Sequence, residues 1–173
     1  MKKVLQFAGL ISLVLAVVAF ILMLATPAVV LTSGNNQYIY KGTVVLFGSK
    51  EAITFAGINL GTAETKLAPL ALIAFILLIV GLIIVALGVI LPLLKVNALE
   101  KFAGILNLAA LVCFVLAGVF MFCVVPNFFA ANEADVPNSA GIGAGWVIGG
   151  ILAIVAGAFA ILPAAAAFFG KKK

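Results

Sequence analysis

The sequence predicts an all-α membrane protein, a bundle of four transmembrane helices with a small extracytoplasmic β-hairpin or sheet formed by the first outer loop. Apolar residues make up 66% of the chain and charged residues only 9%, with a mean hydropathy of +1.41. A soluble domain has about 45–50% apolar and about 25% charged residues. The apolar residues form four long runs, and most lysines lie at their ends. We therefore expect the 173 residues to form a single integral membrane domain whose main partner is the lipid bilayer.

Four apolar runs predict the four helices, at residues 4–26, 68–94, 102–125 and 142–169. Each is long enough to cross a bilayer, which takes about 20 residues. No Lys, Asp or Glu lies inside any of them. Backbone amides at that depth have no water to bond, so each run is expected to be helical. The first run exceeds the apolar length of a signal peptide, and we expect it to be retained.

The first outer loop, residues 27–67, is expected to carry the β-structure. Residues 37–47 and 52–60 are rich in aromatic and β-branched side chains, and residues 48–51 supply turn chemistry, which predicts a β-hairpin. A lone hairpin is marginally stable in water. It is expected to lie against the outer helix ends, or to pair with a strand from the second outer loop, residues 126–141, or from a neighbouring subunit.

The lysines predict the orientation. If the spans alternate, seven lysines and one acid fall on the side of the termini, and three lysines and four acids fall on the other. Both termini are therefore expected to be cytoplasmic. The absence of Arg and of glycosylation sequons favours a bacterial cytoplasmic membrane.

A small residue recurs at every fourth position of the last span, at Gly141, Gly145, Gly149, Ala153 and Gly157. Residues four apart share a helix face, and such a face lets another helix approach closely. The first span offers a counterpart in Gly9, Ser12, Ala16 and Ala19. This packing seam is expected to serve either inside one bundle or between subunits.

Spans one and three begin alike, with Phe7-Ala8-Gly9 and Phe102-Ala103-Gly104. A duplicated two-helix unit and chance similarity both remain open as explanations. The equivalent polar residues of the two spans are Ser12 and Asn107. Because an unpaired amide is costly in hydrocarbon, we expect an interhelical hydrogen bond between them.

Trp146 is expected to anchor the outer membrane interface, as tryptophans commonly do. Tyr38 and Tyr40 are expected either to belong to the same aromatic belt or to form a partner-contact patch. Cys113 and Cys123 lie too far apart on one helix to bridge each other.

The layout of four spans, a long β-rich first outer loop and short further connections resembles that of claudin-like tetraspan proteins. The resemblance covers the whole chain as topology only, because the Trp, Gly-Leu-Trp and Cys-pair signature of the family's loop is absent. It implies a left-handed bundle capped by a small sheet, and side-by-side assembly in the membrane.

We expect a structural or interaction membrane protein that packs laterally, as a homo-oligomer or with another membrane protein, and displays a β-rich cap. The alternative is a small channel or transporter subunit whose pore forms only on oligomerisation. An enzyme is not expected, since the sequence holds no P-loop, nucleophile elbow, HExxH or CxxC motif. No cofactor, metal site or nucleic-acid partner is expected either.

Overall fold

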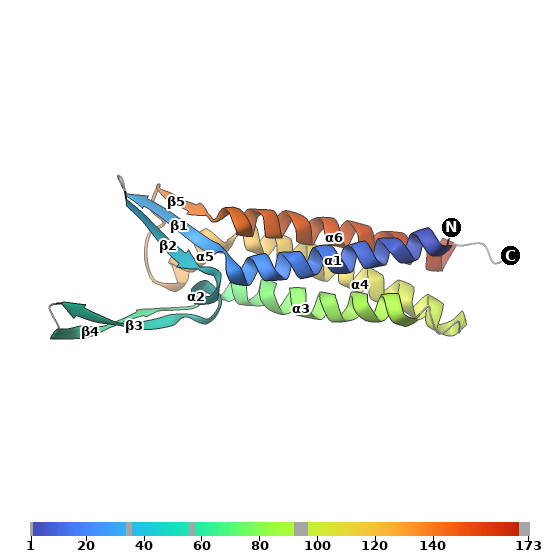
Figure 1. Cartoon of the computed structure of the whole chain (residues 1–173), viewed down its shortest axis with the longest axis horizontal. Coiled ribbons are helices and arrows are strands. Elements are labelled where there is room, and N and C mark those ends of the chain that lie inside the picture. Colours follow the sequence, from blue (N-terminus) through green and yellow to red (C-terminus); the bar gives the residue numbers. More distant parts are fainter. Residues whose placement is uncertain (1, 34–35, 56–57, 92–96, 170–173) are drawn as a thin grey trace.

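The structure is a computed structural model that describes residues 2–33, 36–55, 58–91 and 97–169. Four long helices run side by side along its long axis (Figure 1). They are α1 (Lys2–Ala25), α3 (Pro69–Ile90), α4 (Asn97–Phe122) and α6 (Ala144–Phe169). Each contains a segment long and apolar enough to cross a membrane. The four expected helical spans are therefore confirmed; residues 92–94, the end of the second one, lie outside the described residues.

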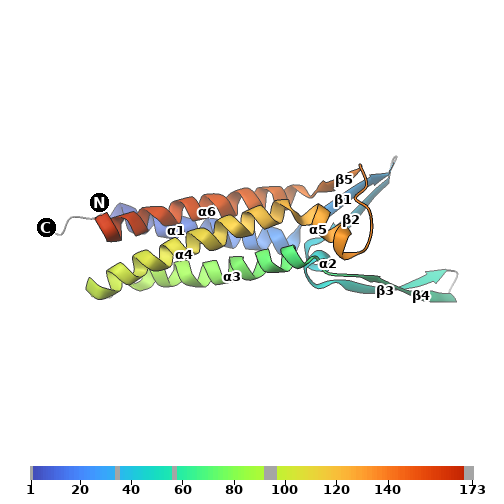
Figure 2. The same cartoon turned by 180° about the vertical axis from the view of Figure 1, so that it is seen from behind.

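The four helices form a ring. Helix α1 packs against α6 and α3, and α4 packs against the same two helices, so α1 and α4 lie diagonally across the bundle. Helix α1 begins and α6 ends at one end of the bundle, and the strands lie at the other (Figures 1 and 2). We call these the terminal end and the cap end.

Size, more than polarity, separates the inner and outer faces of the helices. On α3 most buried residues are Ala or Gly, whereas the exposed large residues are Ile, Val and Leu. Lipid chains are as apolar as these side chains, so helices associate in a bilayer through close packing. Small inner residues let the backbones approach, and larger outer residues face away from the core.

The expected seam residues of the last span lie between α6 and its two neighbours. A Cβ at Gly149 would stand 2.9 Å from Met121 Cε on α4 and 3.4 Å from the Ala19 carbonyl oxygen on α1. A Cβ at Gly157 would stand 3.2 Å from the Leu111 carbonyl oxygen on α4. These glycines are therefore used for packing inside one bundle.

The beginning of the seam differs from the expectation. Gly141 lies in a strand, where a Cβ would meet nothing within 4 Å, because the helix starts only at Ala144. Gly145 is the first helical member and packs against Thr26 beyond the end of α1, and Ala153 is fully buried.

On α1, the counterpart residues are all buried. They are Gly9, Ser12, Ala16 and Ala19. Ser12 and Ala19 contact α6, whereas Gly9 approaches both α3 and α6, at Val89 and Pro163. The α1 set therefore packs against two helices.

Within the described residues, the cap contains five strands and two short helices. They are β1 (Pro27–Ser33), β2 (Asn36–Lys41), α2 (Gly42–Phe47), β3 (Ser49–Phe55), β4 (Ile58–Thr65), α5 (Val124–Ala131) and β5 (Ala140–Ile142). One antiparallel sheet has the order β2-β1-β5, and a second consists of β3 and β4. Strand β5 comes from the second outer loop, so the two outer loops share a sheet. This agrees with the alternative in which the first outer loop pairs with a strand from the second.

The expected pairing within the first outer loop is wrong. Residues 37–41 pair with β1, residues 52–55 pair with β4, and residues 42–47 form helix α2. The β-branched residues of α2 suit a strand by propensity, but tertiary contacts override this preference. The Gly42 N–H donates to the Thr26 carbonyl, and Gly48, at a φ of +74°, ends α2 with a hydrogen bond to the Val44 carbonyl.

Candidate functional site: the junction between bundle and cap

Several polar side chains that bond distant segments of the chain lie where the helices meet the cap. We call this region the junction. Three of them come from the second half of the chain: Asn127 and Asn132 at α5, and Trp146 near the start of α6. Each bonds the backbone of the first half of the chain.

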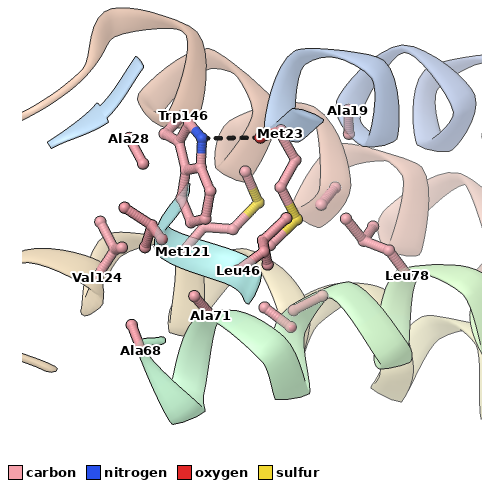
Figure 3. Packing of buried hydrophobic residues seen from close by; sticks show 14 of the residues in the cluster. Ala19, Met23, Ala28, Leu46, Ala68, Ala71, Leu78, Met121, Val124 and Trp146 are labelled. Atoms are coloured by element: carbon pink, nitrogen blue, oxygen red, sulfur yellow. Dashed lines mark hydrogen bonds between the residues drawn. The ribbon is translucent and has the colours of Figure 1, made fainter. Parts of the chain in front are cut away.

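Trp146 is not an interface anchor. Its side chain is fully buried among Met23, Leu46, Met121 and Val124 (Figure 3), and its Nε1 donates a 3.0 Å hydrogen bond to the Met23 carbonyl oxygen. The physical reason is that α1 ends at Ala25, so the Met23 carbonyl lacks an intrahelical partner. The indole N–H supplies the missing hydrogen bond to that carbonyl, and the ring fills the space between the end of α1 and its neighbours.

Other carbonyls at the end of α1 are also satisfied. The Thr26 hydroxyl donates to the Leu22 carbonyl at 2.6 Å, and the Thr26 carbonyl accepts from Gly42 N–H at 3.0 Å. A Cβ at Gly42 would collide with the Met23 carbonyl oxygen. Glycine is required at this position because α2 crosses directly over the helix end.

Asn127 caps helix α3 from another part of the chain. Its Oδ1 accepts a 2.9 Å hydrogen bond from the Leu70 N–H. Pro69 occupies the first turn and Ala68, the N-cap residue, has no side chain oxygen to offer. Helix α5 therefore supplies the missing cap.

Asn132 and Glu133 fix the segment between β4 and α3. The Asn132 amide bonds both backbone groups of Lys66, accepting from its N–H at 2.8 Å and donating to its carbonyl at 3.1 Å. The Glu133 carboxylate binds Lys66 Nζ. This hydrogen bond and the opposite charge raise the pKa of Lys66 and lower the pKa of Glu133. Both side chains are mainly exposed, so solvent screens the attraction.

Glu133 also ends α5 in a left-handed conformation, with a φ of 55°. The Glu133 N–H donates to the Ala130 carbonyl, and the Ala134 N–H donates to the Phe129 carbonyl. This pair of hydrogen bonds ends many helices, and the residue in the left-handed conformation is normally glycine. A glutamate here provides the carboxylate that binds Lys66.

The expected hydrogen bond between Ser12 and Asn107 is not formed. Ser12 donates to the Ala156 carbonyl at 2.7 Å, and Asn107 Nδ2 donates to the Ala103 carbonyl of its own helix at 2.9 Å. Both residues are buried, but they lie on diagonal helices and each bonds a backbone carbonyl closer to it.

Asn107 instead lies against Gly88 of α3. A Cβ at Gly88 would stand 2.8 Å from both Oδ1 and Nδ2 of Asn107. Among the described residues the Oδ1 atom has no hydrogen-bond partner, and it lies close to the glycine backbone, whose Cα–H offers only a weak interaction.

The two related helix starts share a burial pattern. In each, the Phe is exposed, the Ala-Gly pair after it is buried, and the polar residue five positions after the Phe is buried. The sequence similarity between α1 and α4 thus corresponds to equivalent positions in the bundle.

The polar chemistry of the junction is that of hydrogen bonds between side chains and backbone, with one exposed ion pair. The described residues hold no group of three His, Cys, Asp or Glu side chains suited to a metal ion. Cys113 and Cys123 are free and half-buried. Exposed apolar side chains of the cap include Tyr38 on β2, while Tyr40 packs on Phe128 with ring centroids 4.8 Å apart.

Sequence reasoning missed Asn127 and Asn132. Both flank the apolar stretch 128–131, where polar amides at the end of a span are a usable signal, but their bonding partners lie about sixty residues away in the chain. Gly118 and Gly150, whose backbones approach each other across α4 and α6, were also missed because they fall outside the four-residue repeat.

The fold and the four apolar helices indicate an integral membrane protein with a tetraspan topology. No family model matches the chain, and no curated protein matches it significantly.

Proposed function

We propose that the protein is a structural or interaction component of a membrane, in which the bundle holds the chain in the bilayer and the cap is recognised by partners. The junction carries this proposal. The cap helix α5 bonds the start of α3 through Asn127, and the cap helix α2 bonds the end of α1 through the Gly42 N–H, so the cap is attached to the bundle at two places. A fixed surface suits recognition, because little ordering is needed on binding.

The interior of the bundle supports an interaction role over a pore within one chain. Among the described residues the buried side chains are apolar apart from Ser12 and Asn107. Phe114 fills the space beside Gly81 at mid-helix, and the Trp146 cluster fills the cap end. A conducting path would therefore have to form between subunits.

Partner recognition is testable through the exposed cap residue Tyr38. The full chain should be isolated from its native membrane in mild detergent after cross-linking, and the captured proteins identified. Tyr38→Ser should reduce capture of a cap partner, because it removes an exposed aromatic contact. The comparison variant is Ile105→Ala, on the outward face of α4 away from the cap, which should leave capture of a cap partner unchanged because it touches only the lateral surface. If no substitution in the cap changes the amount of captured protein, the proposal is contradicted.

Lateral packing is also proposed, as the resemblance to claudin-like proteins implies. Because α6 uses its small residues against α1 and α4, lateral contacts would use the outward Ile, Val and Leu stripes. Ion flux across vesicles containing the protein, above that of empty vesicles, would favour the alternative of an oligomeric channel subunit.

We further propose that the terminal end faces the cytoplasm of a bacterial cell. The charge difference between the two sides supports this orientation, since lysines are retained on the cytoplasmic side.

A further inference from the structure

Burial of Trp146 leaves the membrane boundary at the cap end without its expected aromatic anchor. Phe47 is an exposed aromatic residue at the same end of the bundle. It is the last residue of α2, the short helix that lies where α1 ends and α3 begins (Figure 1), and it is 56% exposed.

Three aromatic rings form a continuous column at this place. The Phe47 ring meets the Phe75 ring of α3 edge-on, with centroids 5.6 Å apart and an interplanar angle of 88°. Phe75 stacks on Phe20 of α1, with centroids 5.4 Å apart. The aromatic column therefore joins α2 to both neighbouring helices and holds the Phe47 ring in place.

The level of the column follows from the helix ends. Phe20 lies five residues before the end of α1 and Phe75 six residues after the start of α3. At about 1.5 Å per residue, both rings lie about 8 Å inside the helix ends. Phe47 packs on Phe75 from α2, in the cap, and thus lies near the limit of the apolar spans.

The surroundings of Phe47 favour lipid as the occupant. The opposite face of α2 is buried, with Val45 and Leu46 in the core, and α2 itself carries no charged residue. The two helices that carry Phe20 and Phe75 also expose apolar residues near these ends, among them Ile21 and Ile73. Those residues face acyl chains if the helices cross a bilayer.

We propose that Phe47, supported by Phe75 and Phe20, is the residue by which the protein contacts lipid at the boundary between headgroups and acyl chains in the leaflet at the cap end. Helices that lie in the membrane interface place Phe side chains at this boundary. The partner is the lipid surface itself.

Fluorescence quenching tests the proposal in vesicles of phosphatidylcholine. The wild-type chain has one tryptophan, Trp146, which is buried, so its emission is the reference signal. Phe47→Trp adds a second emitter at the proposed boundary. We expect this added emission to be quenched by lipids brominated near the headgroup and to resist aqueous iodide. Val80→Trp, at the middle of α3 and on its exposed face, is the depth control and should be quenched most by lipids brominated near the chain end.

Two results would overturn the proposal. Quenching of the Phe47→Trp emission by iodide but not by brominated lipid would place the side chain in water. Resistance to both quenchers would mean that protein, from a second copy or another partner, covers the column. An unchanged melting temperature of the variant, measured in the same vesicles, shows that the bundle is intact.

Discussion

At the scale of single residues, the contact between Gly88 and Asn107 shows how a polar side chain is accommodated in an apolar bundle. A second contact of this kind lies seven residues away on each helix, where Gly81 of α3 faces Phe114 of α4. A Cβ at Gly81 would stand 2.5 Å from the Phe114 ring. In both layers a glycine of α3 makes room for a large side chain of α4. Asn107 thus occupies a position that an apolar side chain would fill without leaving an oxygen unpaired.

Gly88→Ala is therefore expected to destabilise the protein by about 1–3 kcal/mol, because the added methyl overlaps the Asn107 amide. Asn107→Ala in the Gly88→Ala background should restore much of that loss. Thermal unfolding in detergent measures both effects. Gly141→Ala is the matched control, since a Cβ there meets nothing within 4 Å, and it should leave the melting temperature unchanged. Additive effects of the two substitutions would refute the contact.

At the scale of elements, α3 depends on a cap that another helix provides. Asn127→Ala should cost about 0.5–2 kcal/mol, the usual value for losing an N-cap acceptor. Asn127→Asp keeps the oxygen and adds a negative charge that is favourable at a helix N-terminus, so it should retain most of the stability. Thermal unfolding distinguishes the two, and equal losses would argue against capping.

The attachment of β4 to α5 should depend on pH through Glu133 and Lys66. Because the pKa of Glu133 is lowered in the folded protein, its contribution to the free energy of unfolding is present at neutral pH. This contribution is lost as the carboxylate protonates below about pH 4.5. Because the pKa of Lys66 is raised in the folded protein, its contribution to the free energy of unfolding is lost as the amine deprotonates above about pH 10.5. The melting temperatures of wild type and Glu133→Gln should therefore differ at pH 7 and converge in acid. A difference that persists in acid would show that the ion pair is not responsible.

At the scale of the whole molecule, the prediction concerns orientation. Lys50→Cys should react with a membrane-impermeant thiol reagent on intact cells, because β3 lies at the cap end, and Lys95→Cys should react only after the cells are opened. The wild-type chain supplies the blank, since Cys113 and Cys123 are half-buried. The reverse labelling pattern would invert the proposed topology.

Much of the bundle was predictable because the bilayer imposes a local rule. A run of about 20 uncharged apolar residues must become a helix wherever it sits in the sequence. The same reasoning located the small residues of α6, although Gly141 lies in β5 because the helix begins at Ala144. It also identified Ser12 and Asn107 as buried polar groups.

The cap was less predictable because its strands are chosen by distant partners. Residues 42–47 have the composition of a strand, yet the end of α1 provides a hydrogen-bond acceptor at Thr26 and a helix forms there. Strand β5 pairs with β1 more than a hundred residues earlier in the chain.

The sequence by itself determined the number of long apolar helices, their approximate limits and the uneven distribution of lysines, since each follows from the local balance of apolar and charged residues. Only the tertiary structure decided which side chains meet. It buried Trp146 against an unpaired carbonyl of α1 and separated Ser12 from Asn107 across the bundle diagonal. Hydrogen-bonding groups at helix ends take whichever partner the packing brings near, and local composition does not specify that partner.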